Sequence, residues 1–158
     1  RALILSGGMR QHEEALESLE TALQINPKDA NYHFNKGMIL EEMQRYDDAL
    51  QAYGLAAALN PSLDPAWYRQ GWLLASQGKF NESLPLLDNA TEINSKNAKA
   101  WNTKGLVLEQ MGRPEDAKSC FEKAMALEPN NSEFQENLEK VQADNEMKTE
   151  KTIEFERK

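Results

Sequence analysis

The sequence predicts an all-α fold, an α-α superhelix (solenoid) of stacked antiparallel helix pairs. Three observations predict it: small and apolar residues return every 34 residues, glycines recur inside helical stretches, and prolines close three copies. The clearest columns are Gly37, Gly71 and Gly105, and Ala22, Ala56, Ala90 and Ala124. Chance does not keep this many columns in register, so the chain is a repeat array.

The columns also place the boundaries of the copies. We expect a partial first copy at 1–29, complete copies at 30–63, 64–97 and 98–131, and a C-terminal helix at 132–158. In that last segment Phe134, Leu138 and Val141 lie three or four residues apart, which is typical of a capping helix. Beyond Ala143 charges of both signs alternate, which predicts a frayed or solvated helix.

Each complete copy should contain two helices joined by a short turn. Gly37 and its equivalents lack a side chain where the second helix crosses, so the two backbones can approach closely. Gly78 and Gly112 stand where the turn between the helices is expected. One copy cannot bury its own apolar face, so the copies must stack on one another.

The first copy begins partway through its first helix, at RALILSGG, and Gly7 and Gly8 weaken the end of that helix. The apolar edge that results indicates that upstream sequence is missing or that another chain covers it.

Composition argues against several classes of function. Hydrophobic residues make up 40% of the chain and charged residues 28%, an ordinary balance for a soluble protein, and no apolar run is long enough to span a membrane. The net charge of -8 argues against nucleic acid as a partner. The lone Cys120 cannot form an internal disulfide and fits a reducing compartment, so we expect a cytoplasmic protein.

No catalytic or metal-binding constellation is visible. His12 and His33 have no neighbouring cysteines or carboxylates at metal-ligand spacing, and Cys120 is expected to be a buried thiol. Glu41 and Glu42 are expected on a solvated helix face rather than as a paired acid and base. We therefore predict a protein that is not an enzyme and needs no cofactor or metal.

The pattern resembles the tetratricopeptide repeat, whose 34-residue signature is a Trp, then Gly, then Ala with an aromatic residue, then Pro. The third and fourth copies carry it as AWYRQGWLLASQGKFNESLPLLDNATEINS and AWNTKGLVLEQMGRPEDAKSCFEKAMALEPN. Two departures stand out. His33 takes the first tryptophan position, and a usual leucine is replaced by Lys36, Gln70 and Lys104.

The resemblance implies a concave groove, lined by the first helices, that binds an extended or helical peptide. It places these residues in the groove: Phe34, Asn35, Met38, Tyr68, Arg69, Trp72, Lys99, Asn102 and Leu106. Trp67 recurs as Trp101 and is expected to pack, whereas Trp72 shares its column with Met38 and Leu106. In the groove Trp72 would be a typical interface anchor; the alternative is that it packs against the neighbouring repeat.

One subfamily, the dicarboxylate-clamp co-chaperones, grips the acidic C-termini of heat-shock chaperones through a Lys, Asn, Asn, Lys, Arg set. Only Asn35 and Arg69 match that set in the first register, and only Lys99 matches in the next. The resemblance does not extend to a full clamp. It favours a more apolar peptide with one anionic contact.

The leading hypothesis is therefore a scaffold that binds a peptide segment of a partner protein. Self-association into a homo-oligomer through the open repeat ends is the first alternative, and the interaction domain of a larger enzyme is the second.

Overall fold

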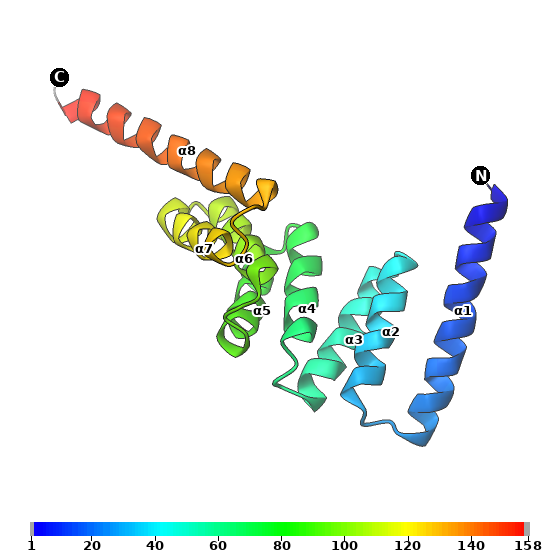
Figure 1. The fold of residues 1–158 in the computed structure, drawn as a ribbon. Coiled ribbons are helices and arrows are strands. Elements are labelled where there is room, and N and C mark those ends of the chain that lie inside the picture. Colours follow the sequence, from blue (N-terminus) through cyan, green and yellow to red (C-terminus); the bar gives the residue numbers. More distant parts are fainter. Residues whose placement is uncertain (1, 157–158) are drawn as a thin grey trace. The chain divides into compact units, whose positions relative to one another are not determined.

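The computed structural model describes the backbone of residues 2–156, the burial of Gly8 and the side chains of residues 10–147. All regular structure in this part of the chain is helical (Figure 1). The helices are α1 (Ala2–Ile25), α2 (Ala30–Glu42), α3 (Tyr46–Leu59), α4 (Asp64–Ser76), α5 (Phe80–Ile93), α6 (Ala98–Gln110), α7 (Pro114–Leu127) and α8 (Ser132–Glu156). The predicted all-α fold of packed consecutive helices is confirmed.

The chain divides into two compact units, Arg1–Leu73 and Leu74–Lys158. In the first unit α2 packs against α1 and α3. In the second unit α6 packs against α5, α7 and α8, and α7 also packs against α8. Among the described residues, no helix is long and apolar enough to cross a membrane.

A glycine stands where α2 crosses α3 in the first unit, and another where α6 crosses α7 in the second. A Cβ atom at Gly37 would lie 2.6 Å from the ring of Tyr53, and one at Gly105 would lie 2.5 Å from the ring of Phe121. Both rings are fully buried. A methyl group therefore has no room at either crossing, as the sequence predicts.

The turns and the helix starts follow from local chemistry. Gly78 and Gly112 have φ of 74° and 72°, and Gln44, in the same column, has φ of 60°. Positive φ favours glycine because it has no Cβ. The side chain of Asp29 caps α2 by accepting from two backbone N–H groups, and Asn97 caps α6 by accepting from one.

The tryptophan column ties each first helix to the turn before it. Trp67 and Trp101 donate from Nε1 to the carbonyl oxygen six residues earlier, at 3.0 and 2.9 Å. The Nε2 atom of His33 lies 2.9 Å from the equivalent carbonyl, so the tautomer protonated on Nε2 makes the same bond. His33 therefore replaces tryptophan in a structural role.

The lysines that replace leucine form ion pairs between consecutive repeats. Lys36 on α2 lies 3.1 Å from Glu20 on α1, and Lys104 on α6 lies 2.7 Å from Asp88 on α5. Glu20 and Asp88 belong to one column, so this is the same contact in two copies. The sequence showed that lysine replaces leucine at these positions, but not which acidic residue each lysine pairs with.

The intervening copy makes the same contact without charge. Gly54 replaces the acidic residue, and Gln70 donates instead to the carbonyl oxygen of Leu50 at 3.1 Å. A Cβ atom at Gly54 would lie 2.8 Å from the Gln70 amide, so the glycine makes room for it.

The first copy differs from expectation. α1 is one continuous helix from Ala2 to Ile25, so the prediction that a helix ends near Gly7 and Gly8 is wrong. The column that supplies the turn at Gly78 and Gly112 holds Arg10 here, and Arg10 pairs within the helix with Glu14 at 3.2 Å. Two glycines cost about 2 kcal/mol in a helix, which does not break it. The predicted apolar edge at residues 3–5 lies outside the described side chains.

α8 closes the second unit. Phe134 and Val141 are buried, and Leu138 packs partly buried against the core beside Val141. The backbone stays helical to Glu156, and the side chains of residues 148–158, where solvation was expected, lie outside the described residues.

Candidate functional site

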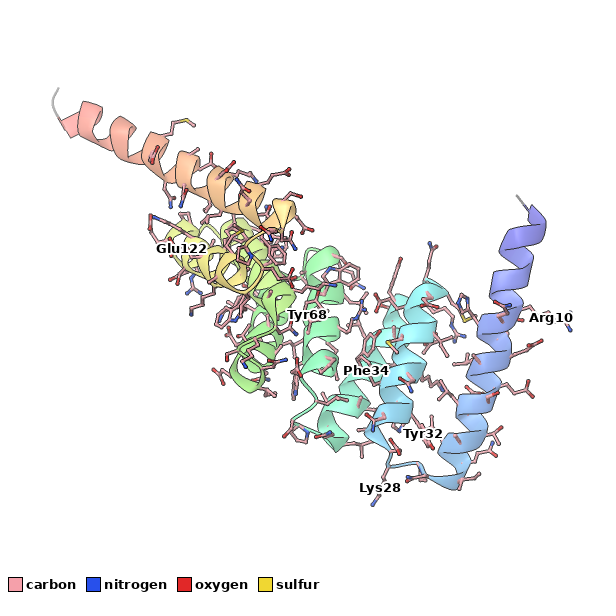
Figure 2. All side chains as sticks on the ribbon, in the orientation of Figure 1. Arg10, Lys28, Tyr32, Phe34, Tyr68 and Glu122 are labelled. Carbon is pink, nitrogen blue, oxygen red and sulfur yellow. The ribbon has the colours of Figure 1, made fainter. Side chains whose placement is uncertain are left out.

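The predicted groove residues of the first unit lie on its first helices. Phe34, Asn35 and Met38 are on α2, and Tyr68, Arg69 and Trp72 are on α4. Figure 2 labels Phe34 and Tyr68 on these two helices. Their environments differ, and the difference separates structural residues from exposed ones.

Phe34 and Met38 are half-buried and support the core. The ring of Phe34 lies 5.4 Å from that of Tyr53, centroid to centroid, and tilted by 46°. Asn35, next to Phe34, is also half-buried, and no side-chain hydrogen bond of Asn35 is found within the described part of the chain.

Trp72 is the exposed aromatic residue of this surface. Its relative exposure is 37%, whereas Trp67, five residues earlier, packs against the core and donates its N–H to a carbonyl. An indole needs both apolar contact and a partner for its N–H to be stable in the core, and Trp67 has both. Trp67 thus packs as the sequence predicts, whereas Trp72 is exposed.

Arg69 of this surface belongs to a network of three polar side chains, with Glu41 and Tyr53. The Oε2 atom of Glu41 accepts a hydrogen bond from the Tyr53 hydroxyl at 2.6 Å, and Oε1 accepts one from Nη1 of Arg69 at 3.2 Å. The Glu41 side chain is only 16% exposed, so the expectation of a solvated carboxylate is wrong for this residue. Burial of Tyr53, together with the bond to Glu41, strongly raises the pKa of the phenol.

The predicted residues of the second unit lie on α6. Lys99 is exposed, and Leu106 packs half-buried against the core. Asn102 is only 3% exposed because α8 covers it. Its amide donates to Glu133 at 3.2 Å and accepts from Asn137 at 3.0 Å, both on α8. This differs from the expected open groove position, since a ligand reaches Asn102 only if α8 moves.

A second ion pair joins α6 to α8. Glu109, two repeats after Glu41, is 15% exposed and lies 2.8 Å from Lys140. The hydrogen bond and the charge of Glu109 raise the pKa of Lys140. The partner of Glu109 lies on a helix beyond the repeats, so the repeat columns could not predict this ion pair.

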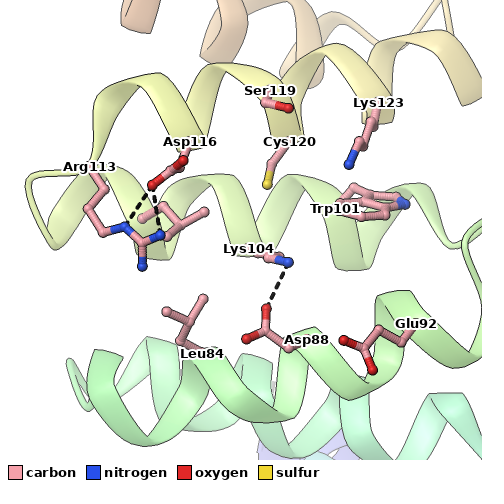
Figure 3. Close-up of a pocket in the computed structure, with 11 residues that line it drawn as sticks. Leu84, Asp88, Glu92, Trp101, Lys104, Arg113, Asp116, Ser119, Cys120 and Lys123 are labelled. Atoms are coloured by element: carbon pink, nitrogen blue, oxygen red, sulfur yellow. Dashed lines mark hydrogen bonds and ion pairs between the residues drawn. The ribbon is translucent and has the colours of Figure 1, made fainter.

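The second unit also has a cleft among α5, α6 and α7, with a volume of about 420 Å³ (Figure 3). Trp101 lines it, with the ammonium groups of Lys123 and Lys104 lying 4.1 and 5.1 Å from the ring centroid. Cys120 faces the same cleft. Burial raises the pKa of this thiol, which keeps it protonated and a poor nucleophile.

The first unit repeats this cleft among the same columns, with a volume of about 200 Å³. His33 takes the place of Trp101, Ala52 that of Cys120, and Leu55 that of Lys123. Over the described residues, no three His, Cys, Asp or Glu side chains gather where they could hold a metal ion.

Models of the tetratricopeptide repeat match residues 7–64, 64–97 and 98–131, one after another. The chain belongs to the tetratricopeptide repeat family. The resemblance seen in the columns is thus confirmed. Solenoids of this kind serve generally as protein-interaction modules.

Solved structures of this family share the fold. MamA 41-end from Desulfovibrio magneticus RS-1 is 22% identical with a TM-score of 0.79, and the match covers 99% of this chain and 93% of MamA. The first tetratricopeptide domain of Spaghetti (RPAP3), bound to the HSP90 peptide SRMEEVD, is 23% identical with a TM-score of 0.70, covering 73% and 91%. YrrB, which has an unusual peptide-binding site, is 23% identical with a TM-score of 0.76, covering 92% and 74%. A comparison with curated sequences found no match.

Proposed function

We propose that this tetratricopeptide repeat protein binds a peptide segment of a partner protein on the groove surface of its first helices. In the first unit this surface consists of Asn35, Tyr68, Arg69 and Trp72, supported from behind by Phe34 and Met38. In the second unit Lys99 and Leu106 offer a corresponding surface on α6.

The observation that carries the proposal is the exposure of Trp72. Its column holds medium-sized apolar residues in the other complete copies, Met38 and Leu106, and both are half-buried. A large aromatic side chain left 37% exposed gives apolar contact area that a bound peptide would bury. Peptide binding by RPAP3, and the peptide-binding site of YrrB, show that related folds support this use.

The test is capture of partner proteins from a lysate by the wild type, by Trp72→Ala and by Tyr46→Ala. Tyr46 is a matched control, because it is 43% exposed but lies on α3 and outside the groove surface. We expect a protein retained by the wild type and by Tyr46→Ala to be lost with Trp72→Ala, while circular dichroism stays unchanged. Equal retention by all three would contradict the proposal and direct attention to self-association.

A further inference from the structure

We propose that Glu41 is a specificity-determining residue. Its carboxylate forms an ion pair with Arg69 and balances that charge, so this groove selects uncharged apolar segments and rejects acidic ones. The inference rests on the proposed function and names the class of partner. It concerns the first unit alone, in which the residues involved lie on α2, α3 and α4.

Glu41 is held in place from two sides. Tyr53 is fully buried, and a buried hydroxyl is costly without a partner, so the 2.6 Å bond to Oε2 fixes the carboxylate. The other oxygen then stays aimed at Arg69, at 3.2 Å. Arg69 is 39% exposed, so the guanidinium faces solvent while its charge is already balanced.

An incoming peptide carboxylate must either share Arg69 with Glu41 or replace Glu41 there. Sharing brings two negative charges to one guanidinium, and their repulsion opposes it. Replacement would leave the Glu41 side chain, only 16% exposed, without its cation, which is unfavourable because the remaining charge has lost both water and partner. Arg69 therefore does not serve as a free anion site.

The remaining charge nearby acts in the same direction. Glu42, adjacent to Glu41, lies 2.7 Å from His12 and is 63% exposed. With the Glu41–Arg69 pair balanced, Glu42 gives this end of α2 a negative potential that repels an acidic segment. Trp72 and Met38 offer apolar and polarisable contacts instead.

The experiment measures the amino-acid preferences of the surface with an array of randomised short peptides that have amidated C-termini, so that only Asp and Glu side chains supply a carboxylate. The variants are Glu41→Gln, Glu42→Gln, Trp72→Ala and the double variant Glu41→Gln/Arg69→Gln. Glu41→Gln keeps a carbonyl that can accept from Tyr53 but removes the charge at Arg69. Glu42→Gln is the matched control, because it removes the same charge without touching Arg69.

We expect the wild type to select apolar, uncharged peptides. Glu42→Gln should raise retention of acidic peptides only slightly, because that charge is 63% exposed and screened by solvent. Glu41→Gln should raise retention of peptides containing Asp or Glu by about tenfold. That gain should disappear in the double variant. Acidic preference in the wild type, or identical profiles for Glu41→Gln and the wild type, would overturn the inference. Two other results would contradict the proposed function, and the inference with it. In one, Trp72→Ala retains the same peptides as the wild type; in the other, neither the wild type nor any variant prefers particular peptides. Circular dichroism of each variant checks that it is folded.

Discussion

The α2–α3 pair of the first unit and the α6–α7 pair of the second are copies of one helical hairpin with a different aromatic residue at the crossing. Tyr53 fills the first crossing and Phe121 the second, each against a glycine. The Tyr53 hydroxyl bonds Glu41, whereas Glu109, which occupies the place of Glu41, bonds Lys140 on α8 instead.

The comparison separates two properties of the aromatic residue at the crossing: the shape of its ring and, in Tyr53 alone, its hydroxyl group. The ring fills the space beneath the glycine in both units, so the packing depends on shape alone. The hydroxyl adds a bond from the core to the carboxylate of the first helix in the first unit alone. In both units a cation on a later helix, Arg69 on α4 or Lys140 on α8, also pairs with that carboxylate. Packing and polar pairing can therefore be altered independently.

The largest effect on stability should come from the contact that both units share, between the glycine and the buried aromatic ring. Gly37→Ala and Gly105→Ala each place a methyl group within 2.6 Å of a buried ring, so we expect each to destabilise the protein by about 3 kcal/mol, as overpacking does. The measurement is urea denaturation followed by circular dichroism, with the free energy of unfolding obtained from the midpoint and slope.

Gly8→Ala is the control for the glycine variants. Gly8 lies within α1, and nothing stands within 4 Å of a Cβ built there. Alanine should therefore stabilise that helix by about 1 kcal/mol. If Gly37→Ala or Gly105→Ala also stabilised the protein, the rings would be able to move aside and the crossings would be less tightly packed than they are in the structure.

These glycines were predictable from the sequence because the same close contact between two helices recurs in every complete copy and leaves a glycine column. The helix pairs, the turns at Gly78 and Gly112 and the packing of Trp67 follow for the same reason. The covering of Asn102 was not predictable, since its partners Glu133 and Asn137 lie on a helix outside the repeated columns. The Glu41–Arg69 pair was also not predictable. It occurs once, and it depends on side-chain conformations that the repeat pattern does not determine.

The next effect concerns the hydroxyl that distinguishes the units. Tyr53→Phe removes a hydrogen bond to a charged group, so we expect a loss of about 1.5 kcal/mol at neutral pH, measured by urea denaturation. Tyr46→Phe is the control, because Tyr46 is 43% exposed and should change stability little. An equal loss in both variants would show that the bond to Glu41 contributes nothing specific.

The same variant predicts a pH dependence. The pKa of Tyr53 is raised in the folded state, chiefly by burial, while an unfolded tyrosine ionises near pH 10. Below about pH 10 both states keep the proton, and the full stabilisation is present. Above it only the unfolded state loses the proton, so the wild type should lose about 1.4 kcal/mol per pH unit relative to Tyr53→Phe. The two proteins should be equally stable near about pH 11; a difference that stays constant above pH 10 would contradict this.

The smallest effect should come from the outer clefts, where Lys123 of the second unit faces Trp101 and Leu55 of the first unit stands near His33. A lysine 4.1 Å from an indole centroid contributes about 0.5–1 kcal/mol at an exposed site. A double-mutant cycle with Lys123→Leu and Trp101→Leu should therefore give a coupling of that size, because each single change removes the same contact. The matching cycle with Leu55→Lys and His33→Trp, which builds the second unit's pair into the first unit, should reproduce the coupling. A coupling near zero in the second unit would mean that Lys123 lies over the ring without binding it, and the two clefts would then differ in shape alone.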